Sequence, residues 1–300
     1  MGAALGELID TGPLPIELGC VAVRDVERAR SRELPAGISV QTPEELVADD
    51  QLDAIVELAG GIDQPNAWAR ATLERGRPYV TGNKALLATH GGELATLAQE
   101  HGGALLASAS VGGATPMIEL VEHLAASARI VRLRGLLNAT TTFILAAMGE
   151  GQPYEAALAE AQQAGYAESD PSFDVEGRDA AQKLAILASV AWGRWRPERD
   201  VRTQGIVGTR VPPGATMRLV AEASEESLDV RPMELPAGTP LASISGIDGM
   251  LEVELRDGAM LRISGPGAGG PVSVGAVYAD LGRLVAGDRP ILFAPRGAAS

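Results

Sequence analysis

Short apolar runs alternate with amphipathic segments along the first 110 residues of the chain. The apolar runs are rich in branched residues and bounded by Gly, Pro or charged residues, which is typical of buried strands. They cover residues 16–23, 54–58, 79–82 and 104–109. The segments between them have helical patterns, and the first of these opens with Thr42 and Glu45, spaced as in a capping box. Strands that alternate with helices predict a parallel, doubly wound α/β sheet.

A glycine-rich turn is missing from the start of this pattern. A dinucleotide-binding domain begins with a strand and a G-x-G-x-x-G turn that holds the pyrophosphate at a helix N-terminus. This chain begins with MGAALGELID, which is typical of the helix that follows such a turn. We therefore expect a Rossmann-like sheet that lacks its first strand, with Gly2 as the last glycine of the fingerprint. A start codon assigned too late and a naturally short chain with a weakened cofactor site both explain the pattern.

The pattern changes after residue 110. Residues 111–195 are mostly helical in pattern, whereas strands and turns follow from about residue 200, including the run at 205–211. The resulting prediction is an α+β second domain, over 111–271, in which helices cover one face of a mixed sheet. A last helix at about 272–286 is expected to return to the dinucleotide-binding domain of residues 1–110. We expect the tail beyond it to be partly disordered.

Composition narrows the classes of function. The chain has 300 residues and a formal net charge of −14, which argues against a nucleic-acid surface or an anionic membrane as partner. No apolar run is long enough for a membrane span, and the N-terminus lacks the basic region of a secretory signal. The single cysteine, Cys20, lies in a strand-like run, so we expect a reducing, cytoplasmic location.

Lysine is almost absent from the chain. Of its 25 basic residues only two, Lys84 and Lys183, are lysines. Arginine can replace lysine on a solvated surface, but not where a compact ammonium must donate to one oxygen or shift its pKa. Chance placement is the alternative for so small a sample. We interpret both lysines as functional candidates.

Carboxylates gather just before the second lysine, in the stretch AESDPSFDVEGRDAAQK. Asp179 and Lys183 lie four residues apart, so they share one face of a helix. An ordinary surface pair of this kind is worth only about 0.3–0.5 kcal/mol. Lys183, however, lies among alanines and Leu184, which indicates a partly buried wall. Carboxylates beside one lysine suit a substrate that carries its own ammonium group, and they favour the charged form of the lysine.

This stretch, within residues 165–187, closely resembles the catalytic signature of the homoserine dehydrogenase family. Residues 56–88, 110–116 and 265–281 also resemble the family, and the likeness runs in order from residue 2 to about 285. The resemblance implies reversible hydride transfer between NAD(P)H and L-aspartate 4-semialdehyde, which yields L-homoserine. It also implies a homodimer, in which residues 111–271 form the catalytic and dimerisation domain.

The resemblance implies roles for individual residues. Lys183 matches the family lysine that donates a proton to the carbonyl oxygen. Lys84 matches the second family lysine, which lies near the nicotinamide and the substrate. Asp179 matches the residue that orients Lys183 and the substrate. The substrate-binding residues implied are Glu168 for the ammonium group, Asp174, Asp179 and Thr140. The cofactor-binding residues implied are Gly2, Arg24, Gly60, Gly61, Lys84, Gly165 and Gly267.

The choice of cofactor depends on the end of the second family strand, VAVRD at 21–25. An acid at this position binds the ribose hydroxyl of NAD, whereas an arginine suits the 2′-phosphate of NADP. Arg24 precedes Asp25, so we predict NADP, with NAD as the alternative. A solvated strand-end charge is the other interpretation of Arg24. Plain tight turns are likewise alternatives at Gly60, Gly61 and Gly267.

The chain departs from the family pattern at two further positions. Ser108 replaces a glutamate that ligates a monovalent cation, and Ala139 replaces a glycine that permits close approach to substrate. The backbone carbonyls of Val111, Gly113 and Thr115 could still contribute to a monovalent-cation site, which is left as an open alternative rather than a metal prediction. Two hypotheses therefore stand beside the working enzyme: a catalytically silent homologue, and a dehydrogenase for a related amino-acid semialdehyde or alcohol.

Overall fold

The computed structural model of the chain describes residues 1–23, 38–267 and 270–294. Its helices are α1 (Gly2–Thr11), α3 (Pro43–Ala48), α4 (Asp63–Leu73), α5 (Lys84–His101), α6 (Met117–Ser127), α7 (Ala139–Gly149), α8 (Tyr154–Gln163), α9 (Ser172–Val175), α10 (Arg178–Trp192) and α11 (Gly270–Val285), with short 3-10 turns η1 (Ser108–Ser110), η2 (Glu198–Asp200) and η3 (Leu241–Ser243). Its strands are β1 (Cys20–Ala22), β2 (Ser39–Gln41), β3 (Ile55–Glu57), β4 (Tyr79–Thr81), β5 (Leu105–Leu106), β6 (Ile130–Leu136), β7 (Arg202–Thr203), β8 (Met217–Ala223), β9 (Leu228–Glu234), β10 (Asp248–Leu255) and β11 (Met260–Pro266).

The N-terminal part is a parallel α/β unit, as the alternating pattern predicts. Its strands form two separate parallel sheets, β1-β2 and β3-β4-β5. In a doubly wound sheet the first strand lies between the second and the fourth. The break between β1 and β3 therefore falls at the position that the first strand occupies in that arrangement. The predicted capping box is confirmed, since Thr42 and Glu45 each accept from the other's backbone amide at the start of α3.

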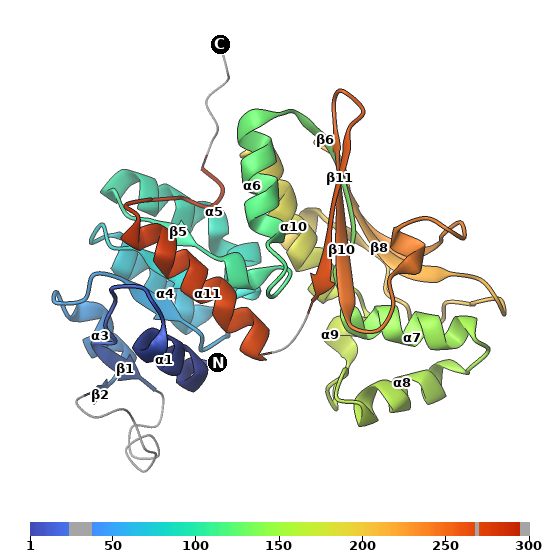
Figure 1. The fold of residues 1–300 in the computed structure, drawn as a ribbon, viewed down its shortest axis with the longest axis horizontal. Coiled ribbons are helices and arrows are strands. Elements are labelled where there is room, and N and C mark those ends of the chain that lie inside the picture. The colour runs from blue at the N-terminus through green and yellow to red at the C-terminus, as the bar shows by residue number, and fades with distance from the viewer. Residues whose placement is uncertain (24–37, 268–269, 295–300) are drawn as a thin grey trace.

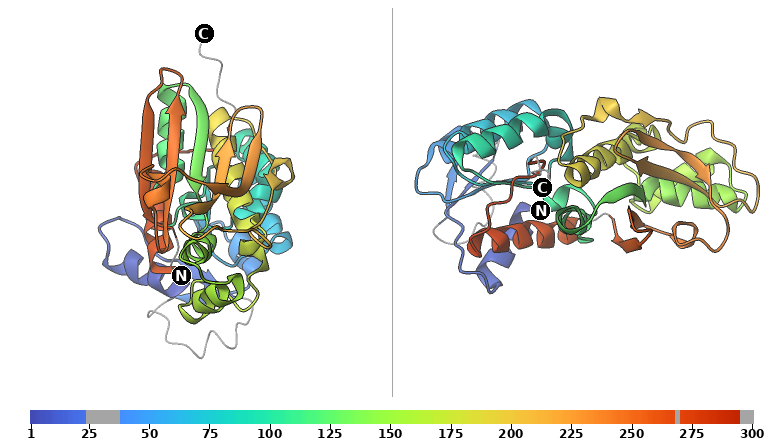
Figure 2. Two further views of the ribbon diagram at one scale, coloured as in Figure 1. Left: turned by 90° about the vertical axis from the view of Figure 1, so that its right-hand side faces the viewer. Right: turned by 90° about the horizontal axis from the view of Figure 1, so that it is seen from above.

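The last helix packs against this N-terminal part. Val274, Val277 and Leu281 of α11 share one buried cluster with Leu5 of α1 and Val80 of β4. Figure 2, seen from above, shows α11 (red) beside α1 (blue). The chain thus returns to the first unit, and the domain limits at residues 110 and 271 stay predictions.

The tail beyond α11 returns to the edge of the parallel sheet. Leu105 donates its amide to the carbonyl of Pro290, and Leu292 donates to the carbonyl of Leu105. Residue 291 therefore extends the parallel sheet past β5. Phe293 is buried nearby, beside Gly91 of α5. Residues 290–294 thus pair with the edge of the sheet and pack against α5, while the expectation of a partly disordered tail stays a prediction.

The second part contains a six-stranded mixed sheet in the order β11-β10-β6-β8-β9-β7. All neighbours are antiparallel except β7 and β9. Helix α10 packs on β6, β8 and β9, with α6 beside it, so helices cover one face as predicted (Figure 1). The run at 205–211 is not a strand. Gly205 passes close to the backbone of Val175 and Glu176, where no side chain fits, and Gly208 has a φ of 75°.

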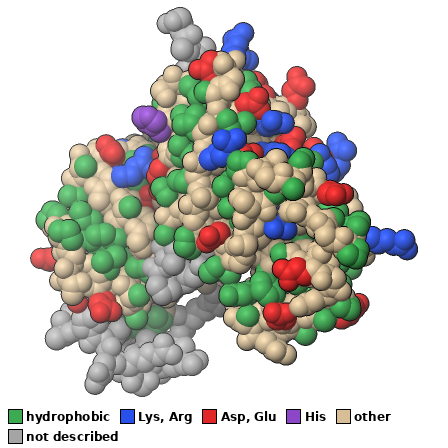
Figure 3. Space-filling view, turned by 45° about the vertical axis from the view of Figure 1, so that its right-hand side comes forward, with side chains coloured by type: hydrophobic (Ala, Val, Ile, Leu, Met, Phe, Trp, Pro, Cys, Tyr) green, Lys and Arg blue, Asp and Glu red, His purple; other side chains and the backbone are tan. Residues whose placement is uncertain are grey.

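The surface mixes both signs of charge. Figure 3 shows acidic and basic side chains interspersed over the visible face, without a single large patch of either sign. No helix in the described part of the chain is long and apolar enough to span a bilayer.

Candidate active site

The carboxylate of Asp179 joins both lysines of the chain. Its Oδ2 accepts a hydrogen bond from Lys183 Nζ at 2.8 Å, and its Oδ1 lies 3.2 Å from Lys84 Nζ. Asp179 and Lys183 lie one turn apart on α10, whereas Lys84 begins α5 in the other part of the molecule. Lys183 also donates to the carbonyl of Leu137 at 2.8 Å, just after β6. The tertiary fold therefore brings together the three residues that the sequence marks as catalytic candidates.

Burial differs between these groups. Asp179 is only 5% exposed, and the Lys183 side chain 14%, while that of Lys84 is 31% exposed. Burial alone would raise the pKa of Asp179, but the ammonium groups of Lys183 and Lys84 and the hydrogen bonds to the carboxylate outweigh it and lower that pKa. Asp179 is thus an anion held between two cations.

A second carboxylate, Asp174, lies beside this group. Its Oδ2 accepts from Thr140 Oγ1 at 3.0 Å, and Thr140 also approaches the carbonyl of Tyr166 at 2.7 Å. The pKa of Asp174 is raised, mainly by burial and also by the charge of Asp179. Two of the predicted substrate residues, Asp174 and Thr140, are therefore in contact next to the lysine pair.

Asn138, which the sequence analysis missed, links the two carboxylates. Its Nδ2 donates to Asp174 Oδ1 at 2.7 Å and to Asp179 Oδ2 at 2.9 Å. Its Oδ1 caps α7 by accepting from the amide of Thr141 at 2.8 Å. An asparagine between a strand pattern and a helix pattern is a capping signal. That signal could have identified the cap, although not the two carboxylates.

An aromatic ring lies over one of the lysines. Lys84 Nζ is 5.5 Å from the centroid of the Phe173 ring, and the Arg178 guanidinium is 5.4 Å from it. These separations are within the range of cation–π attraction. Phe173 belongs to the short helix α9, which also carries Asp174. Its role was not visible in the sequence, because nothing there indicates which cation it meets.

Glu168 and Gly165 are less involved than their neighbours. Glu168 is exposed, and the contact that the structure gives it is made by its backbone carbonyl, which accepts from Gln162. Gly165 has a φ of 75° in the turn after α8, with open space where a Cβ would be. Their predicted roles toward substrate and cofactor stay predictions.

The loop after β3 has the geometry of a nucleotide site. Gly60 and Gly61 have φ values of 70° and 87°, and a Cβ on either would meet nothing within 4 Å. They follow the carboxyl end of a parallel strand, which is where open α/β sheets bind nucleotides. This open backbone leaves room for the close approach of a dinucleotide.

Buried polar residues hold the loop in place. Glu57 Oε1 accepts from the amides of Ala59 at 2.6 Å and Gly60 at 2.9 Å, and its Oε2 accepts from Thr81 at 2.7 Å. Asn83 donates to the carbonyl of Gly61 at 2.7 Å and caps α5, immediately before Lys84. Glu57 was missed, although an acid within an apolar run that precedes two glycines was a usable signal.

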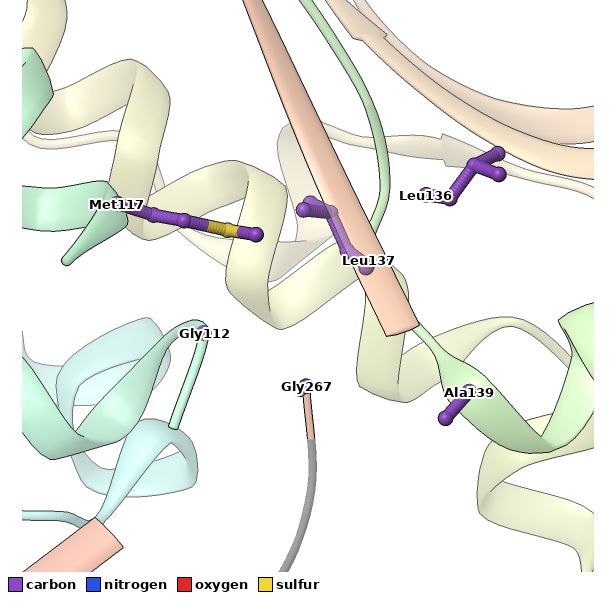
Figure 4. Close-up of a pocket in the computed structure, with 7 residues that line it drawn as sticks. Gly112, Met117, Leu136, Leu137, Ala139 and Gly267 are labelled. Atoms are coloured by element: carbon purple, nitrogen blue, oxygen red, sulfur yellow. The ribbon is translucent and has the colours of Figure 1, made fainter. Parts of the chain in front are cut away.

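The other residues that were predicted to bind the cofactor lie in separate parts of the chain. Gly2 is exposed at the first turn of α1. Arg24 lies outside the described residues. Gly267 helps to line a small cavity at the end of β11 (Figure 4). Ala139, at the start of α7, lines the same cavity, whose complete lining is Gly112, Met117, Leu136, Leu137, Ala139, Gly249 and Gly267.

Ser108, which replaces the family glutamate, is paired with the last helix. Its amide and hydroxyl donate to the two oxygens of Asp280 at 2.9 and 2.6 Å. Burial raises the pKa of Asp280 to about 6, although these hydrogen bonds oppose the shift. No cluster of three acidic, histidine or cysteine ligands occurs among the described residues. The carbonyl site of Val111, Gly113 and Thr115 stays a prediction, and no chemistry is derived from it.

Comparison with known proteins matches nearly the whole described chain. The family model for homoserine dehydrogenase matches residues 116–281, and the model for the homoserine dehydrogenase NAD-binding domain matches residues 1–107. The chain belongs to the homoserine dehydrogenase family. The family resemblance of residues 165–187, 56–88, 110–116 and 265–281 is therefore confirmed.

Individual relatives cover most of this chain but extend beyond it. The homoserine dehydrogenase of Mycobacterium tuberculosis (strain ATCC 25618 / H37Rv) is 38% identical over an alignment of 286 residues, and the match covers 89% of this chain and 64% of that protein. The Bacillus subtilis enzyme is 33% identical, with the same coverage. This chain thus spans about 64% of the length of these relatives.

Solved structures agree with the fold. The homoserine dehydrogenase from Thiobacillus denitrificans superposes with a TM-score of 0.82 at 32% identity, over 89% of this chain and 64% of that one. A hyperthermophilic archaeal homoserine dehydrogenase in complex with NADPH gives a TM-score of 0.77 at 29% identity, over 85% and 78%. The homoserine dehydrogenase fold, a Rossmann-like NAD-binding domain and a catalytic domain with a mixed sheet, is shared.

Proposed function

We propose that this protein catalyses reversible hydride transfer between L-homoserine and L-aspartate 4-semialdehyde, with a nicotinamide cofactor. The observation that carries the proposal is the pairing of both lysines with the buried carboxylate of Asp179, at 2.8 and 3.2 Å. A cationic pair beside further carboxylates suits a substrate that has both an ammonium group and an oxygen on which negative charge develops.

The residues of the chain then have separate tasks. The bound nicotinamide supplies the hydride to the aldehyde carbon. Lys183 donates a proton from Nζ to the carbonyl oxygen as negative charge develops there. Asp179 holds Lys183 in place through a 2.8 Å hydrogen bond and orients Lys84 from the opposite side. In the direction of oxidation, Lys183 takes the hydroxyl proton back.

Binding of the amino-acid part of the substrate depends on the acids around this pair. Asp174 and Glu168 bind its ammonium group, and Thr140 holds Asp174 through a 3.0 Å hydrogen bond. Thr140 and Ala139 lie in the first turn of α7. Ala139 also lines the small cavity at the end of β11, and the substrate is proposed to bind on that side of the helix. Gly165 and Gly267 contribute backbone close to the cofactor.

NADP is the proposed cofactor, with NAD as the alternative. The support comes from the sequence VAVRD, in which Arg24 occupies the position that suits a 2′-phosphate. The ratio of kcat/KM for NADP and NAD, in the parent and in Arg24→Ala, tests this choice. A preference for NADP that disappears in the variant is expected. An unchanged ratio contradicts the role of Arg24.

The decisive experiment is a spectrophotometric assay of homoserine oxidation by this protein, with NADP and with NAD. Related amino alcohols are assayed in parallel as alternative substrates. Homoserine is expected to give the highest kcat/KM. Absence of turnover with every substrate, in a folded protein, would support a catalytically silent homologue. A higher kcat/KM for another amino alcohol would support the related dehydrogenase instead.

Two further proposals concern the state of the molecule. We propose a homodimer, as the family resemblance implies; light scattering is then expected to give twice the chain mass of 31.0 kDa. We also propose a cytoplasmic location, supported by the lone, buried thiol of Cys20. Fractionation of cells that express the tagged protein tests this location.

A further inference from the structure

We infer that Asn138 is a positioning residue, which holds the two site carboxylates, Asp174 and Asp179, at the separation and orientation that substrate binding needs. This inference deepens the proposed function and rests on it. Neither carboxylate can reach its place through local sequence alone, since they lie 36 and 41 residues from Asn138 along the chain. The single amide nitrogen nevertheless contacts both.

The orientation of the Asn138 amide follows from its partners. The oxygen accepts from the Thr141 amide at 2.8 Å and from the Thr141 hydroxyl at 2.9 Å. The nitrogen therefore faces the acids, at 2.7 Å from Asp174 and 2.9 Å from Asp179. The opposite assignment would place an acceptor against two carboxylates and a donor against the helix amide, so it is excluded by the network. Asn138 is 6% exposed, which limits competition from water.

The two carboxylates depend on this amide to different degrees. Asp179 is held by two ammonium groups, Lys183 from its own helix and Lys84 from α5. Asp174 is hydrogen-bonded by two neutral donors, the Asn138 amide and the Thr140 hydroxyl. Loss of the amide therefore removes one of the two hydrogen bonds that favour the charged form of Asp174.

The pH dependence has a defined sign. Asp174 faces Asp179 and Lys183 on α10 and Asn138 and Thr140 on α7. Burial and Asp179 raise the pKa of Asp174, whereas the amide hydrogen bond lowers it. Removal of the amide raises this pKa further, so a higher pH is needed to ionise the carboxylate that binds substrate ammonium.

Variants at position 138 can separate positioning from helix capping. Asn138→Ser and Asn138→Thr keep a hydroxyl oxygen that can cap α7, but neither supplies the two amide N–H donors. Asn138→Ala loses both functions. We expect the Ser and Thr variants to unfold near the temperature of the parent. Their kcat/KM for homoserine should fall about 10- to 100-fold, chiefly through KM, and the acid limb of the pH profile should move to higher pH.

A capping role alone leads to a different result. Asn138→Ser and Asn138→Thr would then match the parent in kcat, KM and pH profile, and only Asn138→Ala would be impaired. That outcome overturns the inference. The Ser and Thr variants serve as each other's second test if one of them fails to fold, with circular dichroism as the check of folding.

A measurement without turnover separates this inference from the proposed function. Carbon-13 NMR of labelled aspartate carboxyls follows the titration of Asp174 directly, with Asp174→Asn used to assign its signal. An upward shift of that titration in Asn138→Ser supports the inference even if the parent does not oxidise homoserine. An unchanged titration overturns it, whatever the assay shows.

Discussion

Lys84 and Asp179 meet across the two halves of the molecule, with 3.2 Å between Nζ and Oδ1. One begins the helix after β4 of the nucleotide-binding part, and the other lies in the first turn of α10 beneath the mixed sheet. The contact places the candidate site at the junction of the parallel unit and the mixed-sheet part. The proposed hydride transfer needs such a junction, since both reactants must be held together.

Replacement of the proposed proton donor should abolish most turnover without loss of the fold. In Lys183→Ala, Asp179 keeps Lys84 as a partner, but the ammonium group that is proposed to donate to the carbonyl oxygen is removed. We expect kcat to fall by about 10²- to 10⁴-fold. Steady-state assays in both directions and thermal unfolding provide the measurement. Arg199→Ala, which removes an exposed charge from η2, is the control. Parent-like turnover in Lys183→Ala would falsify the assignment.

The glycine loop after β3 can be tested against a matched glycine elsewhere. Gly60 has a φ of 70° and Gly102, which ends α5, a φ of 71°, and a Cβ meets nothing within 4 Å at either. Alanine should cost about 1–2 kcal/mol of stability at both positions, because both have left-handed backbone. Only Gly60→Ala should also weaken NADPH binding, by about tenfold, as measured by calorimetry. Equal affinities in the two variants would remove this loop from the cofactor site.

The aromatic ring over Lys84 should contribute modestly. Phe173→Leu keeps apolar bulk but loses the ring face that attracts the ammonium 5.5 Å away. About 0.5–1 kcal/mol of attraction is then lost, which corresponds to a two- to fivefold lower kcat/KM. Phe173→Tyr keeps the ring face and should match the parent. The idea fails if the Leu and Tyr variants show the same kinetics.

Asp280 should make the protein less stable as the pH rises from about 4 to 6. Its pKa is raised from 3.8 to about 6 in the folded state, so the folded protein keeps a proton that the unfolded chain has lost. The contribution of this proton to the free energy of unfolding is present below the unfolded pKa. It is lost as the pH rises through the folded value, a difference of roughly 2–3 kcal/mol.

Urea unfolding at pH 4, 5, 6 and 7 measures this effect. Asp280→Asn can keep the contacts with Ser108, because an amide both donates and accepts. This variant should lack the decline between pH 4 and 6 and exceed the parent in stability at pH 7. Asp248→Asn, at an exposed position, is the control and should retain the decline. A decline that persists in Asp280→Asn assigns the effect to other groups.

Much of the site was visible in the sequence because its chemistry uses rare residue types. Only two lysines occur in the chain, and both contact Asp179. The i, i+4 spacing on α10 already placed Asp179 and Lys183 on one face, since helical geometry is local. By contrast, the strand expected at 205–211 was wrong, because backbone crowding at Gly205 depends on distant segments. The pairing of residues 290–292 with Leu105 depends on distant segments in the same way, and the sequence did not predict it.

The sequence by itself determined the alternation of elements in the first 110 residues, the cap of α3, the family and the residues proposed to carry the chemistry. These follow from periodicity, from one capping signal, from motifs that resemble the family and from the near absence of lysine, all of which are local or countable. Only the tertiary structure decided that Lys84 reaches Asp179, that Asn138 serves two carboxylates, and that Glu57 shapes the glycine loop. Such contacts join residues 3 to 95 positions apart, and most are set by how α5, α7 and α10 pack rather than by neighbours in the chain.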